Sequence, residues 1–457
     1  MNRPAAQHKR VAYPAYKPSG MDWVGDIPEH WEIHRLKHVA SVQFSSVDKH
    51  TVEGEEPVRL CNYVDVYYND FIAAGIEFMS ASATQSEIAR FQLCRGDVLV
   101  TKDSESWDDI AVPSYVAEKL DGVLCGYHLA HIRPHPCKLL GEYLFRAFRS
   151  RGINDQFRVA TNGITRFGLG KYWLDNGLFP VPPLDEQRAI AAFLDRETAR
   201  IDALIEKKRR QIELLQEKRS ALISHAVTKG LDPNAPMKDS GIEWLGEIPR
   251  HWQAKRLRFL VSEPLKYGAN ESAELDDPDL PRYIRITDVD ENGRLRGDTF
   301  KSLPEDVARP YLLKEGDLLL ARSGATVGKS FYYEPSWGRA AYAGYLIRAR
   351  FNPARMMPRF VNYFTNSQQY WQWLGSSFIQ ATIQNVSAEK YANLIVPVPP
   401  VDEQAEIVAY LDGMWKRLND LTRKVGGSIE QLMDYRSALI SAAVTGKIDV
   451  RKETQNE

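Results

Sequence analysis

The stretch Ser19-Gly-Met-Asp-Trp-Val-Gly-Asp-Ile-Pro-Glu-His-Trp31 decides the architecture, because it recurs as Ser240-Gly-Ile-Glu-Trp-Leu-Gly-Glu-Ile-Pro-Arg-His-Trp252. Two further stretches recur at nearly the same separation. They are Val181-Pro-Pro-Leu-Asp-Glu-Gln187 with Val398-Pro-Pro-Val-Asp-Glu-Gln404, and Arg219-Ser-Ala-Leu-Ile-Ser224 with Arg436-Ser-Ala-Leu-Ile-Ser441. Self-similarity at a fixed separation is the sign of a repeated structural unit. The chain is therefore a tandem duplication.

The two copies agree at their ends and diverge in their middles. Between the repeated stretches they share chiefly Gly96-Asp97 with Gly316-Asp317, Gly126-Tyr127 with Gly344-Tyr345, and Lys171-Tyr172 with Lys390-Tyr391. We expect a disordered or extended N-terminal arm at 1–18, a variable globular part at 19–180 and a helical region at 181–239. The second copy then has a globular part at 240–397 and a helical region at 398–457.

Each globular part carries signals for both strands and helices. The runs Asp97-Val-Leu-Val-Thr101 and Asp317-Leu-Leu-Leu-Ala321 begin at Gly-Asp turns, and short apolar runs of this kind predict strands. Helices are expected near 141–148 and 358–363. The predicted fold class is α+β, with two globular domains joined by two long antiparallel coiled-coil helices in a pseudo-two-fold internal repeat.

The helical regions have the apolar period of a coiled coil. Apolar residues recur every three or four positions once Lys208 and Arg219 are accepted in the same row, and so narrow a stripe needs a partner helix. The row contains Ile201, Ile205, Ile212, Leu215 and Leu222 in the first copy, and Leu418, Val425, Ile429, Leu432 and Leu439 in the second. A helix folded back on its own globular part is the alternative.

The ends and interruptions of these helices can also be predicted. Asp185 and Asp402 follow prolines and are expected to cap the two helices. A helix from Asp185 to Val227 would be roughly 64 Å long at ~1.5 Å per residue. The pair Gly426-Gly427 is expected to kink the second helix, because glycine is a poor helix former.

Composition excludes several classes of protein. The chain has 457 residues, of which 44% are hydrophobic and 26% charged, as in ordinary globular proteins. It has no apolar run of ~18 residues and no signal-peptide pattern, so we expect a cytoplasmic protein without a membrane span. The four cysteines contain no CxxC pair, which argues against a disulfide framework. The net charge of −1 means that any attraction to nucleic acid must come from local patches.

Two motifs resemble ligand sites without fitting them. Ser323-Gly-Ala-Thr-Val-Gly-Lys-Ser330 resembles a phosphate-binding loop, but it has one residue too few between its glycines, and the residues after it predict a strand rather than a helix. A second cluster has zinc-ligand side chains, but alternation along a strand would turn His128 and His131 to opposite faces. This cluster is Cys125, His128, His131, His135 and Cys137. We therefore expect no metal and no nucleotide site.

Basic residues are concentrated in one segment of each copy. Residues 122–171 carry eight basic and two acidic side chains, and residues 309–397 carry ten basic and four acidic ones. Such segments attract a phosphate backbone, and Asn, Gln and Arg among them can bind purine edges. A solvated basic face is the alternative. The candidate DNA-binding residues are Lys102, Ser104, Trp107, Asn162, Thr165, Arg166, Lys171, Arg322, Ser323, Thr326, Lys329, Gln380, Thr382, Gln384, Asn385 and Lys390.

The order of these motifs resembles the specificity subunit of Type I restriction-modification systems. The similarity rests on Trp-x-Gly-x-Ile-Pro-x-His-Trp at the start of each half, Gly-Asp-hydrophobic strands leading to Arg322-Ser-Gly-Ala-Thr-Val-Gly328, and Val-Pro-Pro-x-Asp-Glu-Gln before a helix ending in Arg-Ser-Ala-Leu-Ile-Ser. It implies two target recognition domains, each recognising one half of a bipartite DNA site, separated by a helical spacer. The first copy departs from the pattern, since Thr101-Lys-Asp-Ser-Glu-Ser-Trp107 replaces the glycine-rich loop.

The same resemblance implies partners for the protein. Two modification (methyltransferase) subunits would dock on the helical regions, and up to two restriction (endonuclease and translocase) subunits would join them. S-adenosylmethionine, ATP and Mg²⁺ would belong to those subunits, with no cofactor in this chain.

Two other classes of function remain open at this stage. The leading interpretation is a non-catalytic DNA-recognition subunit, because the chain contains no Asn/Asp-Pro-Pro-aromatic tetrapeptide, no His-Glu-x-x-His and no Gly-x-Ser-x-Gly. One alternative is a coiled-coil scaffold that binds other proteins. The other is a nucleotide-dependent nuclease that uses Gly328-Lys329-Ser330. Salt-sensitive binding to duplex DNA would distinguish the recognition subunit from the scaffold. ATP turnover by the isolated chain would indicate the nuclease.

Overall fold

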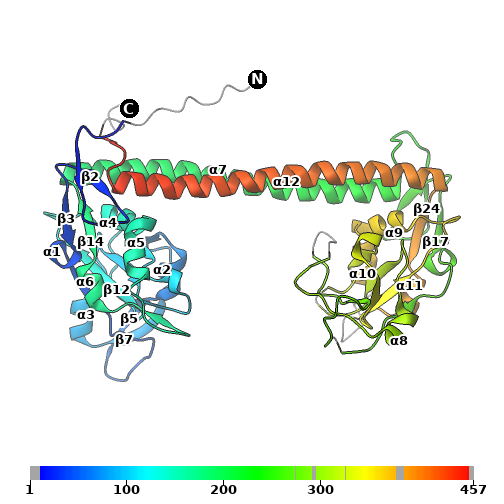
Figure 1. The fold of residues 1–457 in the computed structure, drawn as a ribbon, viewed down its shortest axis with the longest axis horizontal. Helices are drawn as coiled ribbons and strands as arrows, with labels where there is room; N and C mark the ends of the chain where they lie inside the picture. Colours follow the sequence, from blue (N-terminus) through cyan, green and yellow to red (C-terminus); the bar gives the residue numbers. More distant parts are fainter. Residues whose placement is uncertain (1–10, 273, 291–294, 325, 377–384, 452–457) are drawn as a thin grey trace. The chain divides into compact units, whose positions relative to one another are not determined.

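The chain folds into two units, each with one globular part and segments of both helical regions. The structure is a computed structural model that describes residues 11–272, 274–290, 295–324, 326–376 and 385–451 (Figure 1). Unit 1 consists of residues 1–208 and 427–457, and unit 2 of residues 209–426. Among the described helices, none is long and apolar enough to cross a membrane.

Unit 1 is built around a five-stranded sheet of order β4-β12-β8-β10-β6, beside a three-stranded sheet β11-β5-β7. Its strands are β1 (Tyr16–Pro18), β2 (Asp26–Pro28), β3 (Glu32–Arg35), β4 (Ala40–Phe44), β5 (Glu56–Cys61), β6 (Phe71–Ile72), β7 (Met79–Ala83), β8 (Val98–Thr101), β9 (Asp103–Ser104), β10 (Pro113–Val116), β11 (Val123–Cys125), β12 (Leu129–Pro134), β13 (Phe167–Gly168) and β14 (Leu178–Val181). The helices of this globular part are α1 (Leu36–Val39), α2 (Tyr63–Tyr68), α3 (Gln85–Phe91), α4 (Gly141–Phe148), α5 (Arg151–Arg158) and α6 (Lys171–Asn176).

Unit 2 is built around a four-stranded sheet of order β18-β23-β20-β21. Its strands are β15 (Met237–Asp239), β16 (Glu247–Pro249), β17 (Gln253–Arg256), β18 (Lys266–Tyr267), β19 (Arg282–Ile284), β20 (Leu318–Ala321), β21 (Ser330–Tyr332), β22 (Ala340–Tyr342), β23 (Leu346–Ala349) and β24 (Ile395–Val398). The helices of this globular part are α8 (Glu305–Ala308), α9 (Pro358–Phe364), α10 (Gln368–Ser376) and α11 (Ala388–Ala392). The mixture of helices and strands in both units agrees with the predicted α+β class.

The strand registers show that the two units share one scaffold. Leu129 of β12 pairs with Thr101 of β8, and Leu346 of β23 pairs with Ala321 of β20 in the same antiparallel manner. The order β4-β12-β8-β10 thus corresponds to β18-β23-β20-β21. Positions of the two copies can therefore be matched through strand pairing, even where their sequences have diverged.

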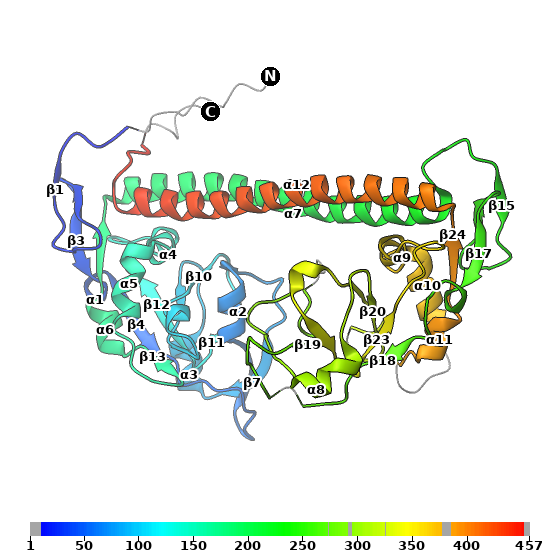
Figure 2. The ribbon, with the colours of Figure 1, turned by 45° about the vertical axis from the view of Figure 1, so that its right-hand side comes forward.

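The predicted strands and helices of the middles are confirmed. Strands β8 and β20 lie within the predicted runs, and all of their residues are buried at the centre of their sheets. Helices α4 and α9 occupy the predicted positions. In unit 1, α4 lies between the sheet and the long helices (Figure 2). Its first residue, Gly141, must be glycine, since a Cβ there would lie 2.0 Å from the carbonyl oxygen of Gly96.

The repeated end motifs contact each other within each unit. In unit 1, Glu186 of the Asp-Glu-Gln motif accepts hydrogen bonds from Trp31 Nε1 at 2.9 Å and from the Tyr13 hydroxyl at 3.1 Å. In unit 2, Glu403 lies 2.7 Å from Nε2 of His251, just as Glu186 lies 2.7 Å from Nε2 of His30 in unit 1. The stretches that begin and end each globular part are therefore alike because each pair builds the same joint.

The glutamines of these motifs are buried and fully used. Gln187 accepts a hydrogen bond from the amide of Leu140 at 2.8 Å and donates to the carbonyl of Pro182 at 2.8 Å. Gln404 accepts from the amide of Met357 at 2.7 Å. Each glutamine thus ties the start of a long helix to the residue that precedes α4 or α9.

The two helical regions form long helices that run in opposite directions within each unit. Helix α7 (Leu184–Lys229) has 46 residues and α12 (Val401–Val444) has 44. In unit 1 the first part of α7 meets the end of α12, where Arg436 donates to Asp202 at 3.1 Å. In unit 2 the end of α7 meets the first part of α12, where the Arg219 guanidinium lies 3.7 Å from the Trp415 ring centroid. Both figures show the two helices side by side.

The start of each helix differs from the sequence prediction. The helices begin at Leu184 and Val401, so Asp185 and Asp402 lie inside the first turn rather than at the cap position. Their negative charges there interact favourably with the positive end of the helix dipole. The glycine pair does not end helix α12, which continues through Gly426 and Gly427, and the expected kink stays a prediction. Packing of the helix therefore outweighs the poor intrinsic propensity of the two glycines.

Candidate nucleic-acid interface

In unit 1, a short two-stranded ribbon brings two predicted DNA-binding segments together. Strand β9 pairs antiparallel with β13, which places Ser104 opposite Phe167 and Asp103 opposite Gly168. The segment that contains Lys102 therefore lies beside the segment that contains Arg166. Strands β10, β11 and β12 and helices α4 and α5 lie between these segments in the sequence, so only the folded chain brings them together.

A polar cluster occupies this meeting point. The Asp103 carboxylate accepts from Lys102 Nζ at 2.8 Å and lies 3.2 Å from Nδ1 of His128. The Arg166 guanidinium lies 3.4 Å from the His128 ring nitrogens. Asp103 thus neutralises part of the charge of Lys102, while Arg166 stays exposed and has no carboxylate partner among the described residues. Arg166 is the cation best placed to bind a phosphate or a base edge.

The loop that carries Asn162 and Arg166 is closed by backbone hydrogen bonds. Asn162 and Gly168 exchange two of them, with N–O distances of 3.2 and 3.0 Å. Gly163 has a φ of +142°, and a Cβ there would lie 1.9 Å from the carbonyl oxygen of Arg166. Only glycine fits this position. The turn leaves Ile164 95% exposed at its tip.

No sequence signal pointed to Ile164, because a single isoleucine in a polar stretch is usually a core residue. Its exposure becomes visible only when the closed loop is known. Apolar side chains presented in this way contact thymine methyl groups or insert between base steps. Ile164 therefore joins the candidate interface.

The other predicted residues of unit 1 have different surroundings. Ser104 is buried, and its hydroxyl accepts from the Ser106 amide at 3.2 Å, so it supports the ribbon from within. Lys171 forms an ion pair with Asp175 at 2.6 Å on α6. The residues whose side chains are exposed are Trp107, Asn162, Thr165, Arg166 and Lys171, while Lys102 is half-buried.

In unit 2, Arg322 takes the place that Lys102 has in unit 1. The amide of Arg322 donates to the Tyr345 carbonyl at 3.0 Å, just as the amide of Lys102 donates to the His128 carbonyl at 3.2 Å. The Arg322 guanidinium lies 4.8 Å from the ring centroid of Tyr267. Its Nε donates to the Asn385 Oδ1 at 3.4 Å. Arg322 and Asn385, both predicted, are therefore brought together.

The Gly-rich loop of unit 2 is a compact turn rather than a phosphate cradle. Gly328 has a φ of +85°, and a Cβ there would lie 2.1 Å from Leu374 of α10. The residues after it form strand β21, as the sequence predicted. Thr326 and Lys329 lie in the turn, Ser323 is bridged to Asn385, and Lys390 lies on α11. Gln380, Thr382 and Gln384 lie outside the described residues.

Strand pairing corrects two of the sequence matches between the copies. Because Leu129 and Leu346 hold the same register, His128 corresponds to Tyr345, one position away from the match of Tyr127 with Tyr345. The match of Lys171-Tyr172 with Lys390-Tyr391 is also displaced, since Tyr172 is 68% exposed and Tyr391 is fully buried. The paired lysines are therefore not equivalent positions.

The basic segment 122–171 is largely neutralised by the fold. Five of its eight cations form ion pairs with carboxylates, most of which lie outside the segment. These are Arg133 with Asp97, Arg146 with Asp195, Arg149 with Asp70, Arg158 with Asp155, and Lys171 with Asp175. The net charge of a segment is thus a poor guide to the surface, and individual exposed residues define the candidate interface.

Two residues of the zinc-like cluster, Cys125 and His131, are buried in the core instead. His131 lies 2.7 Å from the buried carboxylate of Asp97, which also accepts two hydrogen bonds of 2.8 Å from Arg133. Burial alone would raise the pKa of Asp97, but the hydrogen bonds from Arg133 and His131 hold it below its usual value. Burial also raises the pKa of the Cys125 thiol, which disfavours the thiolate that zinc binds.

The predicted seam residues lie along the least exposed row of each helix. Between residues 203 and 221 of α7, the side chains that are not exposed are Ile205, Lys208, Ile212, Leu215 and Arg219. Ile201 and Ile205 are buried, and Ile212, Leu215 and Leu222 are half-buried. On α12, the buried residues are Leu418, Val425 and Leu439, and the half-buried ones are Ile429 and Leu432.

Comparison with known proteins identifies relatives over nearly the whole chain. The family model "Type I restriction modification DNA specificity domain" matches residues 28–214 and 269–431. The putative type I restriction enzyme MjaX specificity subunit of Methanocaldococcus jannaschii is 23% identical over 94% of this chain and 96% of its own length. The type I restriction enzyme EcoBI specificity subunit of Escherichia coli is 23% identical over 67% of this chain and 65% of its own.

Solved structures show the same fold. A chain from a study of complex assembly and conformational transition of the type I R-M system aligns with a TM-score of 0.69 at 17% identity, covering 92% of this chain and 98% of that chain. The HsdS subunit from Thermoanaerobacter tengcongensis aligns with a TM-score of 0.53 at 18% identity, over 92% and 98% of the two chains. With two family matches that coincide with its two copies, this chain belongs to the Type I restriction modification DNA specificity family.

Proposed function

We propose that the protein recognises a bipartite DNA site as the non-catalytic specificity subunit of a Type I restriction-modification complex. One observation carries the proposal: a single scaffold occurs twice with different polar side chains at matched surface positions. Lys102 and His128 in unit 1 correspond to Arg322 and Tyr345 in unit 2. Matched backbones with unlike side chains suit two domains that recognise different bases in the same manner.

The long helices are proposed to act as an antiparallel coiled-coil spacer between the two half-sites. The proposal is supported by the row of less exposed residues in α7, which recurs at steps of three and four. Half-sites on one face of a duplex are separated by multiples of one helical turn, ~34–36 Å. A spacer of fixed length would therefore set the number of unrecognised base pairs between the half-sites.

We also propose the partners that the resemblance implies. Two modification subunits would bind the helical regions, because these regions are alike in both copies and offer the same surface twice. Up to two restriction subunits would join the complex. S-adenosylmethionine, ATP and Mg²⁺ would be bound by those subunits, and this chain would supply recognition alone.

Co-expression with the modification subunit, followed by sequencing of methylated genomic DNA, tests the proposal. A two-part methylated motif with an unrecognised spacer is expected. Replacing Arg166 with alanine should relax only one half of the motif, and replacing Arg322 should relax only the other. The exposed Lys49 of unit 1 is the matched control, whose alanine variant should methylate the unaltered motif. One continuous motif, or loss of both halves from either variant, would count against two independent recognition domains.

A further inference from the structure

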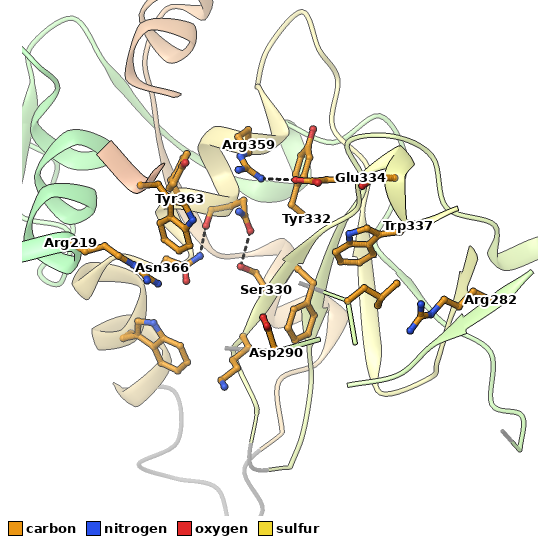
Figure 3. A pocket seen from close by; sticks show the side chains of 17 residues that line it. Arg219, Arg282, Asp290, Ser330, Tyr332, Glu334, Trp337, Arg359, Tyr363 and Asn366 are labelled. Carbon is orange, nitrogen blue, oxygen red and sulfur yellow. Dashed lines mark hydrogen bonds and ion pairs between the residues drawn. The ribbon is translucent and has the colours of Figure 1, made fainter. Parts of the chain in front are cut away.

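Unit 2 contains a cavity of about 570 Å³, and Lys329 alone of its lining residues is also a candidate DNA-binding residue (Figure 3). It is bounded by residues of α7, β21, α9, α10 and α12. Its volume lies in the range of small-ligand sites. Four cations line it, namely Arg219, Arg282, Lys329 and Arg359, together with the carboxylates Asp290 and Glu334.

Arg219 is the distinctive residue of this cavity. Its guanidinium lies 3.7 Å from the ring centroid of Trp415, which shields one face of the charge from water. Burial lowers the pKa of Arg219, although an arginine remains charged at neutral pH. Among the ion pairs of the described residues none involves Arg219. Arg359, in the same cavity, is by contrast held by Glu334 at 3.4 Å and by Asp412 at 3.2 Å.

Unit 1 contains the equivalent arginine, Arg436, together with the groups that it binds. Arg436 stands in the second Arg-Ser-Ala-Leu-Ile-Ser motif where Arg219 stands in the first. In unit 1 it donates to the carboxylate of Asp202 at 3.1 Å and to that of Asp70 at 3.3 Å. Asp70 also pairs with Arg149. A carboxylate supplied by a loop of the same chain thus fills this position in unit 1.

The residue that would supply the helix carboxylate in unit 2 has changed. Counting from the shared motif, the position of Asp202 in α7 is held by Asn419 in α12, and the position of Thr198 is held by Trp415. An amide cannot neutralise a guanidinium, and an indole ring adds a flat apolar wall. Unit 2 therefore keeps the arginine, as Arg219, but has Asn419 in place of the helix carboxylate that pairs with the arginine in unit 1.

We propose that the cavity of unit 2 binds an oxyanion, a carboxylate or phosphate group, with Arg219 as its principal ligand. The carboxylate of Asp70 in unit 1 is the model for the group that would sit there. Lys329 also lines the cavity, and its amine has no ion-pair partner among the described residues. Figure 3 shows Arg219 reaching toward Asn366, whose side-chain amide has a second N–H beside the one that donates to the Asn362 carbonyl at 2.7 Å, and that N–H can donate to the anion. The tryptophans of the wall, Trp337, Trp371 and Trp415, suit a planar group attached to the anion.

Calorimetric titration of the full-length protein tests this site. Sodium pyrophosphate serves as the phosphate probe and N-acetylglutamate as the carboxylate probe, at constant ionic strength so that general screening does not change. Saturable binding with one site per chain is expected for at least one probe. Binding should also change the tryptophan emission, because Trp371 and Trp415 line the cavity. The probe that binds more tightly identifies the source of the anion.

Matched variants make the result specific. Arg219→Gln should weaken binding at least tenfold, while Arg417→Gln, which removes an exposed charge from α12, should leave it unchanged. If Arg219→Gln does not fold, Lys329→Gln provides the second measurement, with a smaller loss expected. Absence of saturable binding of both probes, or equal affinity in the wild type and in the folded variants, would overturn the proposal. A parallel loss of duplex DNA affinity in Arg219→Gln would assign the anion to the DNA backbone and would overturn it as a separate site.

Discussion

The guanidinium of Arg350 donates two hydrogen bonds to the buried carboxylate of Asp317, with distances of 2.7 and 2.6 Å. The same bidentate pair occurs between Arg133 and Asp97 in the other unit. In both units the aspartate follows a Gly in a turn before a central strand, and the arginine comes from the end of the neighbouring strand or just beyond it. The pair therefore fixes the turn that leads into the centre of each sheet.

Replacing Asp97 with Asn should lower the free energy of unfolding of unit 1 by about 2–3 kcal/mol, because a buried group that satisfies Arg133 and His131 loses its charge. Urea unfolding followed by tryptophan fluorescence measures this change. Asp121→Asn, at an ion pair whose side chains are 81% exposed, is the control and should change stability by less than ~0.5 kcal/mol. Equal effects of the two variants would show that the pair does not support the sheet.

The same carboxylate predicts an acid limit to stability. Since the pKa of Asp97 is lower in the folded protein than its usual value of 3.8, its contribution is present above pH 3.8 and is lost as the pH falls through the lower, folded pKa. Unfolding midpoints measured between pH 3 and pH 6 should therefore fall more steeply at the acid end in the wild type than in Asp97→Asn. Parallel curves would contradict this assignment.

Gly163→Ala should weaken DNA binding with little change in global stability, because the added Cβ would force the exposed loop at Ile164 to rearrange. Affinity for the cognate duplex and the thermal midpoint are the two measurements. Gly122→Ala is the control, because Gly122 also has a positive φ of +70° but has no atom within 4 Å of the added Cβ. Similar DNA affinity of the two variants would remove this loop from the interface.

Arg166→Ala should reduce the slope of log affinity against log salt by about one if the guanidinium binds a phosphate. If it binds a base edge, the loss should be about 1–3 kcal/mol at a single base pair. The same measurement applies to the alanine variants of Lys171, Arg322, Lys329 and Lys390. Unchanged affinity and slope for all five would place the DNA on another surface.

Leu215→Glu should lower helix content and the thermal midpoint, because this side chain is half-buried in the least exposed row of α7. The adjacent Leu214 is 49% exposed, and Leu214→Glu is a closely matched control that should leave both quantities nearly unchanged. Circular dichroism separates the two outcomes. If Leu214→Glu were the more disruptive variant, the helices would pair through a different face.

A fragment that ends at Leu231 should form a two-fold dimer. It keeps Ile201 and Ile205 but loses the end of α12, with which they share one buried core. The most economical replacement is the same helix of a second copy, which gives a two-fold interface. Light scattering at micromolar concentration measures the mass, and a stable folded monomer would contradict the paired helices.

The duplication, the long helices and the central strands could be predicted from sequence because they depend on local patterns. The heptad-like row of α7 and the runs that became β8 and β20 are of this kind. The candidate interface was predicted less well, because ion pairs between distant segments neutralise cations such as Arg149, and loop closure exposes Ile164. Comparing the two sequences matched Tyr345 with Tyr127, whereas the pairing of the strands matches it with His128. Contacts that span long separations carry no local signal.

A second contact also occurs in both units, between the glycine that follows a long helix and the Ile-Pro-x-His-Trp motif. Gly446 after α12 packs on Pro28 and Trp31, as Gly230 after α7 packs on Pro249 and Trp252. The amide of Asp449 also donates to the Val11 carbonyl at 2.8 Å. In unit 2 the chain runs directly from Gly230 to Pro249 and Trp252, so a linker could connect the corresponding residues of unit 1 in the same way. A circularly permuted chain, with residues near 450 linked to residues near 11 and new ends opened in the exposed turn at 232–234, should keep the buried cores of both units.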